Sequence, residues 1–190
     1  MEDPREVVKQ NTAKAFDFFW ASDYAKKYYV SNGRALLFDH VYNTIRNLKP
    51  VSLLDVGCGP GDLLKRDSVT PFTVGLDYSV VAARCTQSVS MARPLLADAT
   101  AIPLKSKSFD CVACIETMEH VDFPGKIARE LERVSRKYVV VSVPDGSKDN
   151  WDGHKHFFDL GKLRSLFDGH LIHDEILQGV ILIIVEVNNG

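Results

Sequence analysis

Three glycines in alternate positions form a short turn after an apolar run. Leu53–Val56 leads directly into Gly57–Gly61, and Asp55 stands at the mouth of the turn. Glycines so placed let the backbone turn tightly and let a ligand approach without meeting a Cβ atom. The Asp55 carboxylate would repel a pyrophosphate held at the start of a following helix. The turn therefore favours a ligand with positive charge, unless Asp55 only caps the next turn.

A second carboxylate follows the next apolar run. Asp77 lies 77 minus 57, or 20, residues after Gly57. In nucleotide-binding sheets an acid at about this spacing accepts hydrogen bonds from both ribose hydroxyls. The third glycine of the dinucleotide pattern would fall at Asp62, whereas here it is Gly61. This mismatch, and the acids on both sides of the turn, argue against NAD or FAD. Alternatively, Asp77 only forms the turn that leads into Ser79.

Apolar runs alternate with amphipathic segments along the chain, which predicts a parallel sheet covered by helices. Each carboxylate above ends an expected strand, at the edge where open α/β sheets bind ligands. We expect an α/β, Rossmann-like, seven-stranded, mostly parallel sheet with helices on both faces. Residues 50–190 would form this unit, and residues 1–49 an N-terminal helical lid. The expected strands are 51–56, 72–77, 93–97, 109–115, 138–143, 170–177 and 180–187, and the expected helices are 4–19, 24–30, 34–48, 160–167 and three that begin near Gly61, Ser79 and Pro124.

Composition limits the partners. The chain has 190 residues, and 23 basic against 25 acidic side chains give a net charge of −2, which disfavours nucleic acid and anionic membranes. The apolar run 180–185 is far shorter than the roughly 20 residues of a membrane span. The acidic N-terminus does not resemble a signal peptide, so we expect a cytoplasmic protein with reduced cysteines. Cys111 and Cys114 are three apart on an expected strand, so they should point to opposite faces.

Four ordered motifs resemble the class I S-adenosylmethionine-dependent methyltransferases, in particular the methyltransferase type 11 group. The matching segments are 54–61, 75–79, 97–104 and 108–121, the last running from Ser108-Phe109-Asp110 to Glu119-His120-Val121. The resemblance covers about residues 50–145 strongly. It implies S-adenosylmethionine as the cofactor.

The resemblance also implies a role for individual residues. The turn and Asp55 would meet the amino-acid part of the cofactor, and Asp77 would take the ribose hydroxyls. Tyr78 would lie against adenine, unless it is only a half-buried aromatic residue. Asp98 would accept from the adenine amino group, unless it is an ordinary loop aspartate, and Ile115 with Glu116 would line the sulfonium. The full expected cofactor set is Asp55, Gly57, Cys58, Gly59, Gly61, Asp77, Tyr78, Asp98, Ala99, Ile115, Glu116 and Arg34.

A general base is needed only when the methyl acceptor carries a proton at neutral pH. His120, His154 and Tyr28 are the candidates for this role or for acceptor binding. The alternatives are a loop hydrogen bond for His120 and helix packing for Tyr28. His154 and His156 have a His-x-His spacing, but no carboxylate or cysteine cluster accompanies it in the sequence, so we expect no metal site.

These inferences favour direct methyl transfer to a small-molecule acceptor. A protein acceptor is the first alternative. A nucleic-acid base is disfavoured, because residues 115–118 read Ile-Glu-Thr-Met and lack the Asn or Asp, the two prolines and the aromatic residue that amino-directed enzymes of this fold carry there. A regulatory module that binds S-adenosylmethionine without catalysis is a third class. The acceptor and the oligomeric state stay open.

Overall fold

Seven strands form one sheet in the order β3-β2-β1-β4-β5-β7-β6. The structure is a computed structural model that describes residues 3–25, 34–66, 70–89, 91–149 and 151–187. The strands are β1 (Ser52–Val56), β2 (Phe72–Asp77), β3 (Arg93–Leu96), β4 (Phe109–Ile115), β5 (Ser135–Pro144), β6 (His170–Leu177) and β7 (Val180–Glu186). The helices are α1 (Pro4–Val8), α2 (Ala13–Ala21), α4 (Arg34–Leu48), α5 (Val80–Val89), the short 3₁₀ helix η1 (Met118–His120), α6 (Pro124–Val134) and α7 (Leu160–Arg164).

Strands β1 to β5 are parallel, and β7 runs antiparallel between β5 and β6. Strand β1 pairs with β2 on one side and with β4 on the other. The strand order therefore reverses at β1, and a ligand site is expected beside the carboxyl ends of β1 and β4. This topology confirms the predicted Rossmann-like sheet, and the apolar strand 180–186 is an interior strand.

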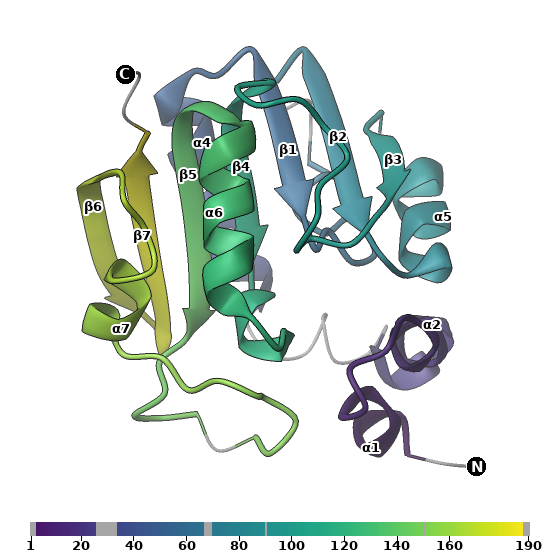
Figure 1. The fold of residues 1–190 in the computed structure, drawn as a ribbon. Helices are drawn as coiled ribbons and strands as arrows, with labels where there is room; N and C mark the ends of the chain where they lie inside the picture. The colour runs from purple at the N-terminus through teal and green to yellow at the C-terminus, as the bar shows by residue number, and fades with distance from the viewer. Residues whose placement is uncertain (1–2, 26–33, 67–69, 90, 150, 188–190) are drawn as a thin grey trace.

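Alternate residues of the central strands face opposite layers of helices. Leu53 and Cys111 pack with α4, whereas Leu54 and Cys114 pack with α6. Figure 1 shows α6 in front of β4 and β5, with α4 behind the sheet. Both layers are apolar, so the inner strands are buried on both faces, as in parallel sheets generally. Cys111 and Cys114 lie on opposite faces, as the sequence predicts.

Two predicted helices differ from the structure. The segment 4–19 is divided into α1 and α2, because Asn11 adopts a positive φ of 49° and Thr12 caps the start of α2. After the glycine turn, Leu64 and Lys65 donate to the Gly61 carbonyl, and no helix continues from this turn in the described residues. The Arg66 guanidinium donates a hydrogen bond to the Asp62 carbonyl. In a continuing helix this carbonyl would instead accept from the backbone N–H of Arg66.

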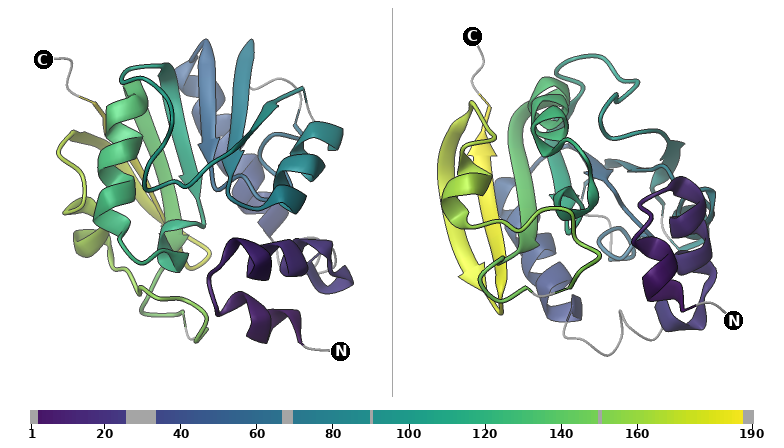
Figure 2. Two further views of the ribbon diagram at one scale, coloured as in Figure 1. Left: turned by 45° about the vertical axis from the view of Figure 1, so that its right-hand side comes forward. Right: turned by 60° about the horizontal axis from the view of Figure 1, so that its bottom comes forward.

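The two N-terminal helices lie beyond the carboxyl ends of β1 and β2 (Figures 1 and 2). Asp17 on α2 anchors them, because its Oδ1 accepts from Ser79 Oγ at 2.5 Å and from Val81 N at 3.0 Å. Asp17 therefore satisfies a backbone donor at the start of α5, where such donors have no partner within the helix. Among the described residues, no helix is long and apolar enough to cross a membrane.

Candidate active site

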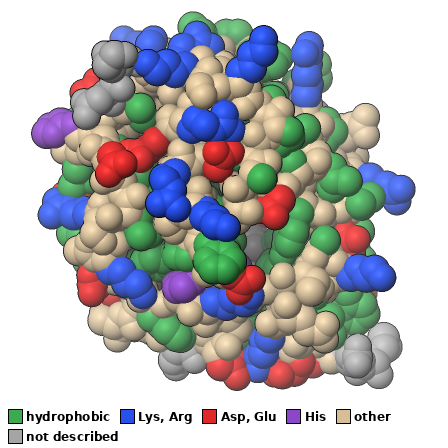
Figure 3. All heavy atoms as spheres, viewed as in Figure 1, with side chains coloured by type: hydrophobic (Ala, Val, Ile, Leu, Met, Phe, Trp, Pro, Cys, Tyr) green, Lys and Arg blue, Asp and Glu red, His purple; other side chains and the backbone are tan. Residues whose placement is uncertain are grey.

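A cavity of about 780 Å³ lies at the carboxyl edge of the sheet. One wall consists of the ends of β1, β2 and β4 with the glycine turn. The other consists of α1, α2 and residues 151–155 of the loop after β5. On the face in Figure 3, basic and acidic side chains are interspersed, so the described residues on this face form no large patch of one sign.

The glycine turn is tightly held between neighbouring segments. Gly57 has a φ of +73°, and a Cβ atom there would lie 2.3 Å from Thr117 Oγ1. Gly59 has a φ of +51°, and its Cβ would lie 3.1 Å from Trp20 Cζ2 on α2. Side chains rarely adopt such φ angles. Both positions therefore require glycine, and the turn presents bare backbone to the cavity.

Two buried carboxylates lie beside the turn. Asp55 is 2% exposed and Asp77 is 6% exposed. Burial, with repulsion from Asp77 and Asp62, raises the pKa of Asp55 to about 8. Burial also raises the pKa of Asp77, although backbone donors oppose the rise. A cation placed between these acids would be strongly stabilised, because it would offset their mutual repulsion.

The backbone holds Asp77 at both oxygens. Gly59 N donates to its Oδ2 at 2.9 Å, and Ser79 N donates to its Oδ1 at 2.8 Å. A carboxylate has about four lone-pair sites, so each oxygen can accept one more hydrogen bond. Asp77 is therefore fixed in position and still able to accept from two neighbouring hydroxyls.

Next along the edge, three predicted residues line one part of the cavity: Tyr78, Asp98 and Ala99. The Tyr78 ring lies 5.6 Å from that of Phe16 on α2. Asp98 is exposed, and its Oδ1 accepts from Thr100 N at 2.7 Å and from Thr100 Oγ1 at 2.8 Å. The aromatic walls and the carboxylate suit a flat ring with an amino group, although the Asp98 contacts also suit an ordinary loop turn.

Ile115 and Glu116 continue the cavity wall at the end of β4. Ile115 is buried, and Glu116 has a positive φ of 53° that turns the chain toward η1. Ser142 Oγ donates to Glu116 Oε1 at 3.2 Å. A non-glycine residue in this conformation is uncommon, and the resulting bend brings η1 to the cavity.

The remaining predicted residues are Gly61, Cys58, Tyr28 and Arg34. Gly61 lies in the turn but is outside the cavity lining among the described residues. Cys58 lines the cavity, but its thiol lies 3.5 Å from Thr86 Oγ1, and burial raises its pKa well above the usual value. Tyr28 and the side chain of Arg34 lie outside the described residues, so their predicted roles stay predictions.

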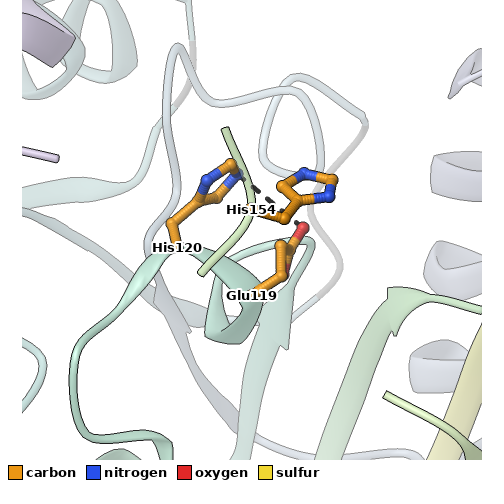
Figure 4. A group of neighbouring side chains, drawn as sticks. All are labelled: Glu119, His120 and His154. Carbon is orange, nitrogen blue, oxygen red and sulfur yellow. Dashed lines mark ion pairs between the residues drawn. The ribbon is translucent and has the colours of Figure 1, made fainter. Parts of the chain in front are cut away.

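His120 and His154 lie side by side in the cavity wall, with ring centroids 4.9 Å apart (Figure 4). Glu119 adjoins them, with its Oε1 3.8 Å from His120 Nε2. His154 Nδ1 is hydrogen-bonded to Asp149 Oδ2 at 2.5 Å. The structure thus brings together two predicted residues, and it adds two carboxylates that were not predicted.

Residues that line or support the cavity were also missed. Phe16 contacts both Tyr78 and His120, Trp151 contacts both histidines, and Asp17 holds α2 on α5. Lys9 Nζ reaches Asp152 Oδ2 at 2.8 Å and joins α1 to the loop after β5. The aromatic residues near the N-terminus were a visible signal, but helix packing explained them equally well.

A family model described as a methyltransferase domain matches residues 54–141. This segment belongs to the methyltransferase domain family. It contains the turn, Asp55, Asp77 and Asp98, and it ends in β5, before the loop that carries His154. S-adenosylmethionine is the cofactor of this family, as the sequence motifs imply.

Two curated relatives match over part of their length. Norajmaline N-methyltransferase from Rauvolfia serpentina is 32% identical over 112 residues, which are 53% of this chain and 37% of that protein. The mitochondrial ubiquinone biosynthesis O-methyltransferase of Candida albicans is 30% identical over 96 residues, 45% of this chain and 29% of that protein. The matched region therefore spans about a third of these relatives.

The fold matches solved methyltransferases along almost its whole length. Magnesium protoporphyrin IX methyltransferase from Synechocystis, solved with bound S-adenosylmethionine, superimposes with a TM-score of 0.69. The match covers 98% of this chain and 97% of that chain, at 14% sequence identity. At this identity the likeness establishes the class I fold.

Proposed function

We propose that the chain is an S-adenosylmethionine-dependent methyltransferase that acts on a small-molecule acceptor by direct methyl transfer. One observation carries the proposal: the same cavity has buried acids and bare glycine backbone on the sheet side and an aromatic wall on the side of α1 and α2. The first wall suits a cationic nucleoside, and the second suits a compact apolar acceptor.

The acidic residues fit the cofactor. Asp55 and the nearby carbonyls would hold its ammonium group, which favours the ionised form of Asp55. Asp77 would accept from the two ribose hydroxyls while keeping its backbone donors. Asp98 would accept from the adenine amino group, with Tyr78 and the backbone of Ala99 against the ring. Cys58 and Ile115 would close this side of the cavity, and the glycine turn would pack against the amino-acid part.

When bound, S-adenosylmethionine supplies a methyl group on a positively charged sulfur. An acceptor lone pair can attack the methyl carbon, and the sulfur leaves as a neutral thioether. The chain's own residues then have two tasks. Ile115, Glu116 and the N-terminal helices orient the acceptor and exclude water, which accounts for much of the rate of such transfers. His120 and His154 are placed to take a proton from an acceptor that carries one.

Two features support a small acceptor. Phe16, Phe19 and Trp20 cover the cavity from α2, and the Lys9–Asp152 ion pair joins the two segments of this wall. The two relatives, by their names, methylate norajmaline and act in ubiquinone biosynthesis. Protein acceptors are disfavoured in this proposal, since a peptide needs an open groove. We place the reaction in the cytoplasm, where four free cysteines are stable.

The test is transfer of labelled methyl from S-adenosylmethionine into a fractionated cell extract, with D77A as the control enzyme. We expect label in low-molecular-mass compounds with the unsubstituted protein and none with the variant. Label only in protein or nucleic acid would overturn the small-molecule acceptor. Cofactor binding without any transfer would overturn catalysis and favour a regulatory module.

A further inference from the structure

Three side chains of residue types that commonly bind metals converge at the wall of the cavity. One ligand atom from each of Glu119, His120 and His154 lies within 4.8 Å of those of the other two (Figure 4). Glu119 and His120 come from η1, and His154 comes from the loop after β5. In the sequence His154 forms a His-x-His pair with His156, whereas the fold brings the Glu119 carboxylate and the His120 imidazole beside it.

The ligand types match a transition-metal centre. Two imidazoles and one carboxylate bind zinc in several enzymes and leave further positions open. Ligands at about 2.1 Å from one ion lie roughly 3 to 4 Å from one another. His120 Nε2 and Glu119 Oε1 are 3.8 Å apart, which is within this range, and no two of the three ligand atoms are more than 4.8 Å apart.

A second carboxylate supports one of the ligands. Asp149 Oδ2 lies 2.5 Å from His154 Nδ1, and both side chains are nearly buried. This bond favours the proton on Nδ1, which puts the lone pair on Nε2, the form in which imidazole binds a metal. A carboxylate behind a histidine ligand is the usual support in metal sites.

The backbone joins the two segments that carry the ligands. The Glu119 carbonyl accepts from Lys155 N at 2.8 Å and from His156 N at 3.2 Å. The Glu119 side chain is 1% exposed, and its Oε1 lies beside the His120 imidazole. His120 and His154 line the cavity, so an ion held here would have its open positions toward that space.

We propose that Glu119, His120 and His154 bind one divalent transition-metal ion whose open positions face the cavity and take an oxygen atom of the methyl acceptor. Metal binding stands by itself, whereas the contact with the acceptor rests on the proposed function. A bound cation stabilises a deprotonated hydroxyl. The acceptor class is then an alcohol or phenol. The ion would lower the pKa of its hydroxyl, the proton would leave to solvent water, and the oxygen would take the methyl group as S-adenosylhomocysteine departs. With the ion bound, His120 and His154 act as ligands and not as bases.

Metal titration of the tag-free, chelator-treated protein tests the site. We expect calorimetry to show one Zn²⁺ per chain with micromolar or tighter affinity, and Co²⁺ to give a visible absorption band from nitrogen ligands. E119Q keeps the shape of Glu119 and should lose at least tenfold in affinity, as should H154A. D149N should weaken Zn²⁺ affinity about tenfold or more, because His154 would lose the carboxylate that orients its ring.

His156 supplies the matched control, because it lies in the same loop and is not one of the three converging residues. H156A should bind Zn²⁺ like the unsubstituted protein, and circular dichroism verifies that each variant is folded. The absence of saturable Zn²⁺ and Co²⁺ binding, or equal binding by E119Q, H154A and H156A, would overturn the metal site. Aromatic packing of the histidines against Phe16 and Trp151 would then account for the cluster.

Titration of S-adenosylhomocysteine into the same samples separates the two proposals. Binding of the nucleoside without binding of metal overturns the metal site alone. Binding of metal without the nucleoside overturns the proposed function alone. If both bind, O-methylation of a phenol by the unsubstituted protein and its loss in E119Q would support the acceptor role, whereas unchanged turnover in E119Q would overturn it.

Discussion

The two walls of the cavity are held by different means. On the sheet side, Gly57 N and Cys58 N donate to the Leu76 carbonyl, and Asp77 is bonded to backbone donors at both oxygens. In the other wall, a side chain, Asp17, links α2 to α5, and the Lys9–Asp152 ion pair links α1 to the loop after β5. The first wall is part of the sheet, whereas the second is attached to it.

This difference fits a division of labour. Backbone contacts constrain the sheet side, which suits the unchanging shape of a cofactor. Side-chain contacts allow the other wall to vary with few substitutions, which suits an acceptor that differs between enzymes. We therefore expect substitutions on the sheet side to have the larger effects on folding and on nucleoside binding, and those on the other wall to have smaller ones.

The largest effect is expected for G57A. A left-handed φ costs a side chain about 1 to 2 kcal/mol, and the new methyl group would collide with Thr117, at a further cost of about 1 to 3 kcal/mol. Urea unfolding should show a loss of about 3 kcal/mol. Gly125 in α6 is the control, because a Cβ there meets nothing within 4 Å. G125A should leave stability unchanged or raise it, and equal losses in the two variants would contradict a rigid turn.

The second effect concerns pH. The pKa of Asp55 rises from 3.8 to about 8 in the folded chain, so between these values the folded state holds a proton that the unfolded state has released. Retention of this proton stabilises the folded state fully at pH values below the unfolded-state pKa of Asp55. The free energy of unfolding then falls by about 1.4 kcal/mol per pH unit as pH rises toward the folded-state pKa. D55N should remove that slope in unfolding measured from about pH 6 to about pH 8.

D55N also separates stability from binding. The variant should be more stable than the unsubstituted protein near the upper end of that pH range, yet it should bind S-adenosylhomocysteine more weakly. An unchanged slope of unfolding free energy with pH would contradict the burial of an Asp55 that titrates near neutral pH.

A smaller effect is expected from the anchor of α2. D17A removes the acceptor that caps α5 and should cost about 1 kcal/mol in stability, with a several-fold weaker affinity for the nucleoside. Lys14, which is exposed on the same helix, gives the control variant K14A. A loss in D17A as large as that in G57A would erase the distinction between the two walls.

The smallest effect is expected for K9M, which breaks the ion pair with Asp152. The Asp152 side chain is 74% exposed, and salt screens such pairs. The unfolding midpoint should move little, and the difference should vanish at high salt. K65M, which breaks the comparable pair with Asp62 beside the glycine turn, is the control. A large, salt-independent loss in K9M alone would show that α1 is held more firmly than proposed.

The sequence predicted the sheet side far better than the other wall. Asp55 and Asp77 end apolar strands, and the order of parallel strands brings such ends together, so local pattern and topology suffice there. The cluster of Glu119, His120 and His154 depends on how a loop folds back on η1, and no local pattern encodes that. Asp17 resembles any other polar residue on a helix until the position of α5 is known.

Calorimetric titration with S-adenosylhomocysteine of the unsubstituted protein, D77A and D110N tests the central claim most directly. Asp110 is a buried carboxylate at the opposite edge of the sheet, where it accepts from Val51 N. We expect one nucleoside per chain, an affinity at least about 100-fold weaker in D77A because two hydrogen bonds to a charged group are lost, and an unchanged affinity in D110N. Equal affinity in D77A and the unsubstituted protein would contradict the claim.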